Sequence, residues 1–386
     1  MRILHVVPSY FPAIRYGGPI FAIHALCRAL TSRGHVVEVF TTSIDGPTNS
    51  AVPHDVPVIL DGVKVRYFES SYLRRLSWAP SLGRALRREI KGADVVHLHS
   101  VFLWPTWVAA RVALGSGVPY VVSPRGMLVQ KLFEARHRLL KRAWVDLIEK
   151  SNLEKAAAVH VTSGIEAADL AEFGFRLRQV VTIPNGVDGS DNVPTRNPAD
   201  DIRALKTSEP LILFFGRLSW KKGLDVLLHA FAHTQTGTLA IVGTDDENLS
   251  PQLSKLAREL DIAHRVQFVP RTVTGSDKEH VFASADAFVL PSHSENFGNA
   301  ALEAMQRGLP VIVSQNVGAS EIVRASGGGI IVECDPPQLG AAIKLLAENP
   351  ALRKLLGEKG QNFVRENYNW PSVAARMEAF YMSLKI

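Results

Sequence analysis

The chain has 386 residues, more than one hydrophobic core usually spans, so two domains are expected. Its apolar fraction of 46% and charged fraction of 21% are those of an ordinary globular protein. The net charge of +6 favours anionic partners, but nucleic acid is disfavoured because no zinc-ligand cluster, RNA-binding aromatic signature or helix-turn-helix pattern occurs. The two cysteines, Cys27 and Cys334, offer neither a disulfide framework nor metal-ligand spacing, which favours a reducing cytosol.

The N-terminal segment MRILHVVPSY has too short an apolar run for a signal peptide and is predicted to form the first buried strand. No segment reaches the roughly 18 uncharged apolar residues that a membrane-spanning helix needs. These two features predict a cytoplasmic protein.

Short apolar runs recur along the chain and alternate with amphipathic stretches of helix length. They lie at residues 2–7, 35–42, 63–69, 94–100, 120–124, 158–163 and 180–184 in the first half, and at 211–216, 238–243, 266–270, 287–292 and 310–314 in the second. Such alternation is typical of parallel sheets covered by helices on both faces. The sequence therefore predicts an α/β fold with two Rossmann-like doubly wound domains facing across a cleft.

The seam between the two halves is predicted at residues 183–210, a polar stretch rich in Pro, Gly, Asn and Asp. It gives an N-terminal domain of residues 1–188 and a C-terminal domain of residues 205–370. Ligands of doubly wound sheets bind outside the carboxyl ends of the strands, often against helix N-termini. Functional side chains are therefore expected in the loops that follow strands.

The segment FFGRLSWKKG, residues 214–223, joins a predicted strand to a predicted helix. Arg217 and Lys222 flank its short loop. Two cations at a strand exit beside a helix N-terminus form a receptor for a diphosphate. The alternative is a solvated basic turn.

The segment SENFGNAALEAM, residues 294–305, follows another predicted strand, and its helix is expected to begin near Gly298 or Asn299. Glycine lets a ligand approach the backbone, and the N–H groups of a first helical turn can hold a phosphate. Glu303 is then placed to accept hydrogen bonds from a ribose diol, and Glu295 to face a sugar hydroxyl. The alternative for each glutamate is an ordinary exposed acid.

The first strand is joined to its helix by PSYFPAIRYGGP, in which Gly17 and Gly18 allow close backbone approach or form a simple turn. The pattern is not G-x-G-x-x-G, so the nicotinamide fingerprint is missing. His97 and His99 lie two apart on a predicted strand and share a face. His99 is the ligand candidate and His97 the core candidate; no third ligand with suitable spacing is apparent, so no metal site is predicted.

Two other chemistries find little support. The acids of GTDDEN, residues 243–248, follow a strand and are interpreted as solvated turn acids, not as a metal site. The sequence has no G-x-S-x-G element, which disfavours a hydrolase triad.

Two basic stretches lie in the first half, at residues 72–91 and 131–150. Lys and Arg interleaved with apolar groups fit a helix on an anionic membrane surface. A domain helix with a solvated cationic face fits equally well.

Taken together, these motifs resemble the retaining glycosyltransferases of family 4, which have the GT-B fold. The resemblance covers essentially the whole chain and rests on the N-terminal GG loop, DVVHLH, PNGVD, GRLSWKKG, GLPVIVS and ENFGNAALE, whose glutamates are spaced E-x7-E. A weaker similarity concerns SPRGML, residues 123–128, which resembles a segment found in family members that build cell-surface polysaccharides. The resemblance also implies that a final helix, residues 371–386, packs back on the N-terminal domain.

The resemblance implies a role for each candidate residue. Arg217 and Lys222 match the pair that holds the donor diphosphate. Glu303 matches the glutamate that binds the ribose, and Glu295 the one near the transferred sugar. His99 matches a histidine near the sugar, and Gly18 a glycine that approaches the diphosphate. Phe297, Gly298 and Asn299 match residues that supply backbone amides to the donor.

The implied reaction moves a sugar from a UDP- or GDP-linked donor to a hydroxyl of a glycan or lipid-linked acceptor, with retention and without a metal or other cofactor. The implied setting is polysaccharide synthesis in the cytoplasm, peripheral to the inner face of the membrane. The residues agree with this chemistry, because Arg217, Lys222 and a helix terminus are placed to stabilise the charge on the departing diphosphate. Alternatives are a nucleotide-sugar epimerase of the same fold, which needs no acceptor, and a non-catalytic two-lobed binding protein.

Overall fold

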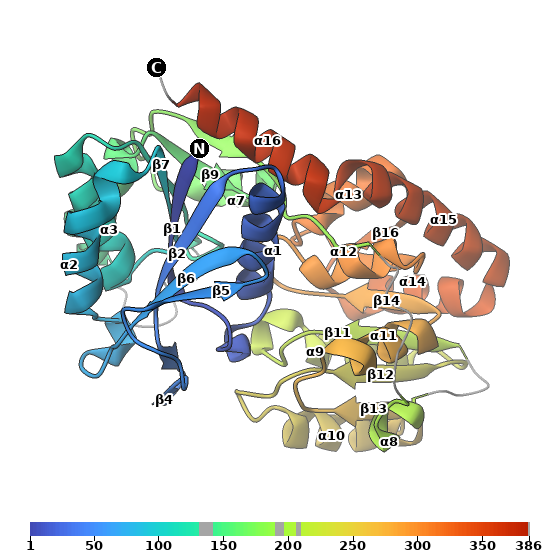
Figure 1. Cartoon of the computed structure of the whole chain (residues 1–386). Helices are drawn as coiled ribbons and strands as arrows, with labels where there is room; N and C mark the ends of the chain where they lie inside the picture. Colours follow the sequence, from blue (N-terminus) through green and yellow to red (C-terminus); the bar gives the residue numbers. More distant parts are fainter. Residues whose placement is uncertain (131–141, 190–196, 206–209, 385–386) are drawn as a thin grey trace. The chain divides into compact units, whose positions relative to one another are not determined.

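The computed structural model describes residues 1–130, 142–189, 197–205 and 210–384 (Figure 1). The chain divides into two compact units. Unit 1 comprises Met1–Gly186 with Trp370–Ile386, and unit 2 comprises Val187–Asn369. The chain therefore passes from one unit to the other within the seam expected at residues 183–210.

Unit 1 is built on an eight-stranded sheet with the strand order β10-β9-β8-β7-β1-β2-β6-β5. Its neighbouring strands are parallel, except that β5 runs antiparallel to β6. The strands are β1 (Arg2–Ser9), β2 (Val36–Thr42), β5 (Pro57–Leu60), β6 (Val63–Phe68), β7 (Val95–His99), β8 (Tyr120–Ser123), β9 (Ala158–Val161) and β10 (Val180–Thr182), with a separate ribbon of β3 (Ile44–Asp45) and β4 (Thr48–Asn49). All seven strands predicted in the first half are confirmed, whereas β3, β4 and β5 were not predicted.

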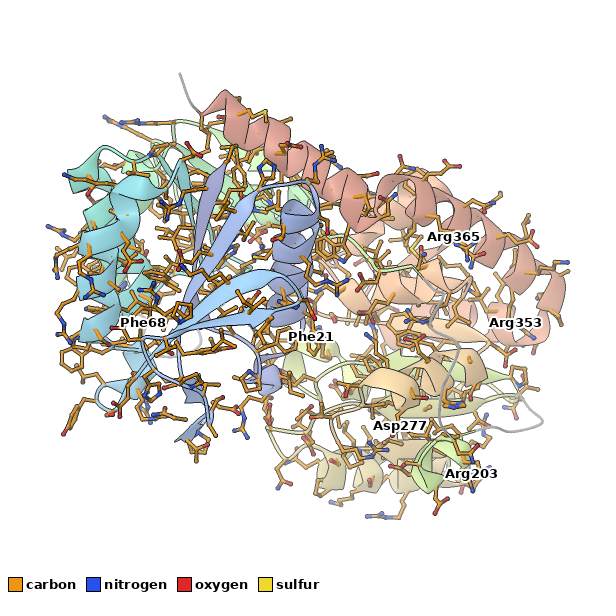
Figure 2. All side chains as sticks on the ribbon, in the orientation of Figure 1. Phe21, Phe68, Arg203, Asp277, Arg353 and Arg365 are labelled. Atoms are coloured by element: carbon orange, nitrogen blue, oxygen red, sulfur yellow. The ribbon has the colours of Figure 1, made fainter. Side chains whose placement is uncertain are left out.

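Helices cover both faces of this sheet, which confirms the doubly wound architecture (Figure 1). The α-helices are α1 (Gly18–Ser32), α2 (Pro80–Glu89), α3 (Trp104–Ser116), α6 (Lys150–Lys155), α7 (Gly164–Ala171) and α16 (Trp370–Ser383), and the short turns are η1 (Ile14–Tyr16), η2 (Arg74–Leu76), η3 (Ile90–Gly92) and the π-helix η4 (Val145–Glu149). Because side chains alternate along a strand, Leu4 and Val6 of β1 pack under α2 and α3, and Ile3 and Val7 pack under α1 and α16. Phe68, labelled in Figure 2, is fully buried in the first of these cores.

Unit 2 contains a parallel six-stranded sheet with the order β13-β12-β11-β14-β15-β16. Its strands are β11 (Leu211–Phe215), β12 (Thr238–Val242), β13 (Val266–Val269), β14 (Ala287–Leu290), β15 (Val311–Ser314) and β16 (Gly329–Val332). Its helices are α8 (Asp200–Arg203), η5 (Trp220–Lys222), α9 (Leu224–Ala232), α10 (Ser250–Glu259), η6 (Ala263–Arg265), α11 (Gly275–Ser284), α12 (Asn299–Gln306), α13 (Ala319–Ser326), α14 (Pro336–Glu348) and α15 (Pro350–Asn367). The five predicted strands are confirmed, and β16 is an addition.

Each sheet has one point at which successive connections leave in opposite directions. In unit 2 this point lies between β11 and β14, because β12 and β13 continue on one side and β15 and β16 on the other. In unit 1 it lies between β1 and β7. Loops diverge at such a switch point and leave a crevice in which ligands of doubly wound folds bind.

The end of the chain belongs to unit 1. Helix α16 packs against α1, and its residues Val373, Met377 and Tyr381 are buried in the core beneath that helix. Among the described helices, none has both the length and the apolarity required to cross a membrane.

Candidate active site

The loop after β11 contains both predicted cations. Arg217 is exposed, and no hydrogen bond or ion pair joins its side chain to another described residue. Lys222 ends η5, and Gly223 then adopts φ +63° before α9 begins. A Cβ atom at Gly223 would lie 2.4 Å from the carbonyl oxygen of Pro291, which follows β14. Glycine at this position therefore lets the loops at the two sides of the switch point pack directly against one another.

The acids of the GTDDEN segment support the neighbouring backbone. Asp245 accepts hydrogen bonds from the N–H groups of Leu249 and Ser250, at 2.7 and 2.8 Å, where α10 begins. Glu247 accepts one from the N–H of Trp220 at 3.2 Å. This segment thus shapes the loop after β11, a more specific role than that of the solvated turn acids predicted from the sequence.

The segment at residues 294–305 forms the expected helix start. Helix α12 begins at Asn299, and Gly298 precedes it with φ +91°. A Cβ atom at Gly298 would lie 2.9 Å from Cγ1 of Val317, so the backbone turns where a larger residue does not fit. The Phe297 side chain is buried in the unit 2 core, which leaves only its backbone for contact with a ligand.

Both predicted glutamates form ion pairs with lysines. Glu295 pairs with Lys222, and their side chains are 23% and 19% exposed, so the pair is only partly screened by water. Glu303 pairs with Lys278 of α11, with 2.7 Å between Nζ and Oε2. The geometry thus brings Glu295 together with the predicted diphosphate-binding lysine and supplies Glu303 with a partner that sequence analysis missed.

Lys278 had no motif around it by which it could be predicted. Its position depends on the packing of α11 beside α12, where its Nζ also lies 5.8 Å from the ring centroid of Phe215. Three cations, Arg217, Lys222 and Lys278, and two acids therefore lie in the loops and helices at the switch point of unit 2. Such an array can bind an anion through Lys222 and a polar diol through Glu303.

Of the unit 1 candidates, Gly18 begins α1, and Gly17 before it adopts φ +75°. There is open space around a Cβ atom built on Gly17, so a ligand can approach the backbone there. This loop follows β1 and thus lies at the switch point of unit 1.

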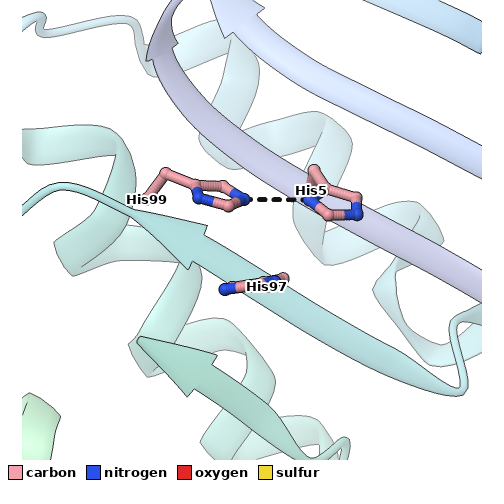
Figure 3. Close-up of side chains that lie close together, drawn as sticks. All are labelled: His5, His97 and His99. Carbon is pink, nitrogen blue, oxygen red and sulfur yellow. Dashed lines mark hydrogen bonds between the residues drawn. The ribbon is translucent and has the colours of Figure 1, made fainter. Parts of the chain in front are cut away.

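His99, the other unit 1 candidate, ends β7 and has no exposed surface. Its Nε2 lies 2.9 Å from Nδ1 of His5 (Figure 3). Its Nδ1 lies 3.3 Å from Nη2 of Arg125. His97 is equally buried and has its Nδ1 2.6 Å from the hydroxyl of Tyr381 in α16. His97 is therefore a core histidine, as expected. Because His99 is buried to the same extent, burial does not distinguish a ligand candidate from a core residue here.

The sequence suggested no third histidine, and the structure corrects this. His5 lies opposite His97 in the register of β1 and β7, and one ring nitrogen from each of His5, His97 and His99 lies within 4.8 Å of the others. Burial lowers the pKa of His5 to about 3, and the Arg125 charge acts in the same direction. Burial also lowers the pKa of His97 and of His99 well below the ordinary value. All three rings are therefore uncharged at neutral pH.

The cluster nevertheless suits a metal ion poorly. A metal-bound histidine donates its other ring N–H to an acceptor. The other nitrogen of His99 instead faces Arg125, whose guanidinium has donors only and carries a positive charge. The donor set therefore does not match a cation bound through His99.

A hollow of about 440 Å³ lies between α2 and α3 of unit 1. The residues that line it do not belong to the loops described above. Its lining includes Arg87, Trp104, Trp107 and Arg111, with the Arg111 guanidinium 5.6 Å from the Trp107 ring. On α2, Arg84 and Arg88 are exposed as well, whereas Leu82 and Leu86 are buried. The basic stretch at residues 72–91 thus presents a solvated cationic face, and residues 131–141 of the second stretch lie outside the described residues.

Comparison with known proteins assigns the family. A model of the glycosyl transferase 4-like domain matches residues 17–186, and a model of glycosyl transferases group 1 matches residues 196–363. The first corresponds to unit 1 and the second to unit 2. The chain is a glycosyltransferase of the family 4 type.

Curated relatives match this glycosyltransferase over nearly its full length. An uncharacterized glycosyltransferase, MJ1607, from Methanocaldococcus jannaschii is 26% identical over 97% of this chain and 96% of its own. A GDP-mannose:cellobiosyl-diphosphopolyprenol alpha-mannosyltransferase from Xanthomonas campestris is 28% identical over 88% of this chain and 86% of its own.

Solved structures confirm the GT-B fold. Sucrose-phosphate synthase from Thermosynechococcus elongatus superposes with a TM-score of 0.79 at 24% identity, covering 99% of this chain and 98% of its own. Anabaena Alr3699/HepE, solved in complex with UDP and glucose, superposes with a TM-score of 0.77 at 19% identity, covering 99% and 100%.

Proposed function

We propose that this glycosyltransferase moves a sugar, with retention, from a UDP- or GDP-linked donor to a hydroxyl of a glycan or lipid-linked acceptor. The observation that supports this most is the placement of Lys222 with Glu295, and Glu303 with Lys278, at the switch point of unit 2. The relative HepE binds UDP and glucose, and the Xanthomonas relative is a mannosyltransferase acting on a diphosphopolyprenol-linked sugar. These support a nucleotide-sugar donor and a lipid-linked acceptor in polysaccharide synthesis.

In this proposal unit 2 binds the donor and unit 1 binds the acceptor. Arg217 and Lys222 hold the diphosphate, and the N-terminus of α12, at Gly298 and Asn299, adds its dipole. Glu303 accepts hydrogen bonds from the ribose hydroxyls. Breaking the sugar–phosphate bond then leaves charge on the diphosphate, which these cations stabilise most strongly in the transition state.

Retention is expected to involve the donor itself. Glu295 is tied to Lys222, so it is placed to orient the sugar and the cation together and not to attack the anomeric carbon. A donor phosphate oxygen can accept the proton of the incoming hydroxyl on the same face of the sugar. This route needs no protein nucleophile.

The test is turnover of a panel of nucleotide sugars by the purified protein. Release of nucleoside diphosphate that depends on an added hydroxyl acceptor, with an α-linked product from an α-linked donor, is the expected result. Lys222→Ala is expected to reduce this release strongly. The matched control is Lys354→Ala, at an exposed lysine that forms an i,i+4 surface pair with Glu358. Donor turnover without any acceptor would favour the epimerase, and binding without turnover the non-catalytic protein.

Activity is expected to be independent of divalent metal. Arg217 and Lys222 supply the positive charge that a Mg²⁺ or Mn²⁺ ion supplies in other phosphate-transfer sites. Excess EDTA should therefore leave the initial rate of transfer largely unchanged. Complete loss of activity that Mg²⁺ or Mn²⁺ restores would contradict this prediction.

The enzyme is also expected to associate with the inner face of the membrane through the cationic face of α2. Each Lys or Arg near an anionic surface contributes roughly 1 kcal/mol, so replacing Arg84, Arg87 and Arg88 by Gln should weaken vesicle binding about a hundredfold at modest salt. Co-sedimentation with vesicles of anionic lipid measures this. The basic residues Lys131, Arg138 and Lys141 lie outside the described residues.

The matched control for this membrane prediction replaces three exposed lysines of unit 2, Lys344, Lys354 and Lys359, and makes the same change in net charge. It should bind vesicles like the wild type. Equal weakening by both triple variants would indicate a non-specific charge effect, and binding that ignores salt and the α2 variant would contradict membrane association.

A further inference from the structure

Helices α11 and α12 of unit 2 are joined by two ion pairs that run in opposite senses. Lys278 of α11 pairs with Glu303 of α12, with 2.7 Å between Nζ and Oε2. The next residue of α11, Glu279, accepts hydrogen bonds from Arg307 at the end of α12, from Nε at 2.9 Å and from Nη2 at 2.7 Å. Because Glu303 and Arg307 are four residues apart, they lie on the same face of α12. Two consecutive residues of α11 therefore hold this face.

The Glu279–Arg307 pair anchors the two helices. Its side chains are 14% and 16% exposed, and two parallel hydrogen bonds fix the guanidinium against the carboxylate. A further bond runs from Nη1 of Arg307 to the carbonyl oxygen of Glu303 at 2.9 Å, so the backbone of Glu303 is tied to the same pair. The packing of α11 on α12 therefore has an anchor that does not involve Lys278.

The Lys278–Glu303 pair is more open to solvent. Each of its side chains is 25% exposed, so a ligand can reach the carboxylate. Within the described part of the chain, Lys278 is the side chain that pairs with this carboxylate, and it contacts Oε2. A carboxylate accepts about four hydrogen bonds, so acceptor positions that include those of Oε1 remain for a ligand.

We infer that Lys278 is a positioning residue that fixes the Glu303 carboxylate and thereby makes the donor site select ribose over 2′-deoxyribose. The inference rests on the proposed function in assigning Glu303 to the ribose. A glutamate side chain has several rotatable bonds, and without a partner its carboxylate samples many orientations. Held by Lys278, the carboxylate presents its acceptors in one orientation, which suits two neighbouring hydroxyls. A 2′-deoxyribose leaves one acceptor without a donor, and a site built to bind a hydroxyl rejects an analogue that lacks it.

The alternative role for Lys278 is direct contact with the donor diphosphate. Such a contact would strengthen the binding of ribonucleotides and deoxyribonucleotides by the same factor, because the diphosphate is common to both. A positioning role acts on the 2′-hydroxyl. The short distance to Glu303 favours positioning, since the ammonium already has an anionic partner. The preference between the two sugars therefore separates the roles.

The test is isothermal titration calorimetry of the full chain with UDP, GDP and the 2′-deoxy form of each. The wild type should bind UDP or GDP about tenfold more tightly than its 2′-deoxy form, the factor that corresponds to 1.4 kcal/mol. Lys278→Met should nearly abolish this preference by weakening the ribonucleotide and not the deoxyribonucleotide. Lys278→Arg, which keeps a cationic donor, should restore the preference in part.

The matched control is Lys255→Met, because Lys255 of α10 is 73% exposed and forms an i,i+4 surface pair with Glu259. It should bind all of these nucleotides like the wild type. Lys278→Met and Lys255→Met should also melt at similar temperatures without nucleotide, since the Glu279–Arg307 pair is intact in both.

Turnover gives a second readout. Lys278→Met should raise the donor KM about tenfold and leave kcat nearly unchanged, because the ribose is held equally in the ground and transition states. A structural defect would instead lower kcat as well.

Four outcomes would each overturn the inference: a wild type without ribose preference, a wild-type preference in Lys278→Met, equal weakening of both sugar forms by that variant, or its failure to fold. The last would assign Lys278 to the packing of α11. If the wild type binds neither UDP nor GDP, the proposed function fails and the inference with it. Binding without a ribose preference removes the inference alone.

Discussion

Replacing Glu295 by alanine is expected to lower kcat for sugar transfer by about tenfold to a hundredfold, with little change in the donor KM. Replacing Glu303 by alanine is expected to raise the donor KM by a similar factor and to change kcat little. A lost charge-assisted hydrogen bond is worth roughly 1.5–3 kcal/mol, which corresponds to this range. In the proposed mechanism Glu295 lies beside the sugar, where charge develops, whereas Glu303 holds the ribose equally in ground and transition states, and the split between kcat and KM follows from this difference.

The ion pairs sharpen this kinetic prediction. Glu295→Ala also frees Lys222, which can then bind the diphosphate more tightly in the ground state, so the donor KM should stay constant or fall. Glu303→Ala frees Lys278, and the double variant Glu303→Ala with Lys278→Met should show no further loss if the lysine acts only through the glutamate.

The kinetic experiment needs a control acid outside the site. Glu358 of α15 is suitable because it is exposed and its one ion pair with a described residue is a surface pair with Lys354. Steady-state kinetics of Glu358→Ala should match the wild type. If Glu295→Ala and Glu303→Ala behave like it, the assignment of residues 294–305 to the donor site is wrong.

The fold was predictable to the extent that local patterns determine it. Buried parallel strands such as β11 and β14 read as continuous apolar runs because both of their faces are covered. The missed strands do not have that pattern. β5 is an antiparallel strand at the edge of the sheet, exposed at Pro57 and at Ile59. β16 opens on Gly329, where a Cβ atom would lie 2.1 Å from the carbonyl oxygen of Val311, so its glycine marks close strand approach and not a turn.

The candidate site was predictable where a motif lies within one loop. The loop carrying Arg217 and Lys222 and the start of α12 follow strands, as their spacing indicated. Lys278, Arg125 and His5 were not predicted, since their contacts depend on which strands and helices become neighbours. Strand order is a tertiary property that one-dimensional spacing does not contain.

Helix α16 provides the second large expected effect, on stability. Trp370 begins this helix, is 7% exposed, and packs so closely on Gly186 that a Cβ atom there would lie 2.7 Å from its Cδ2. Trp370→Ala should therefore cost about 3–5 kcal/mol through lost burial and a residual cavity. That is a large fraction of the roughly 5–15 kcal/mol that stabilises a typical domain.

The loss should be confined to unit 1, because all residues of the core that contains Trp370 belong to that unit, among them residues of β1, β2, α1 and α16. Hydrogen–deuterium exchange in increasing urea separates the two units, and peptides of β1 and α1 should lose protection at lower urea while those of β11 and β14 keep theirs. Met382→Ala on the same helix is the control, since that side chain is 52% exposed and its removal leaves no cavity. Equal loss in β11 and β14, or wild-type protection of β1, would show that α16 does not complete the core of unit 1. The expected pattern would show that α16, which follows unit 2 in the sequence, is a structural part of unit 1. The contact between His97 and the Tyr381 hydroxyl would then depend on the last helix of the chain.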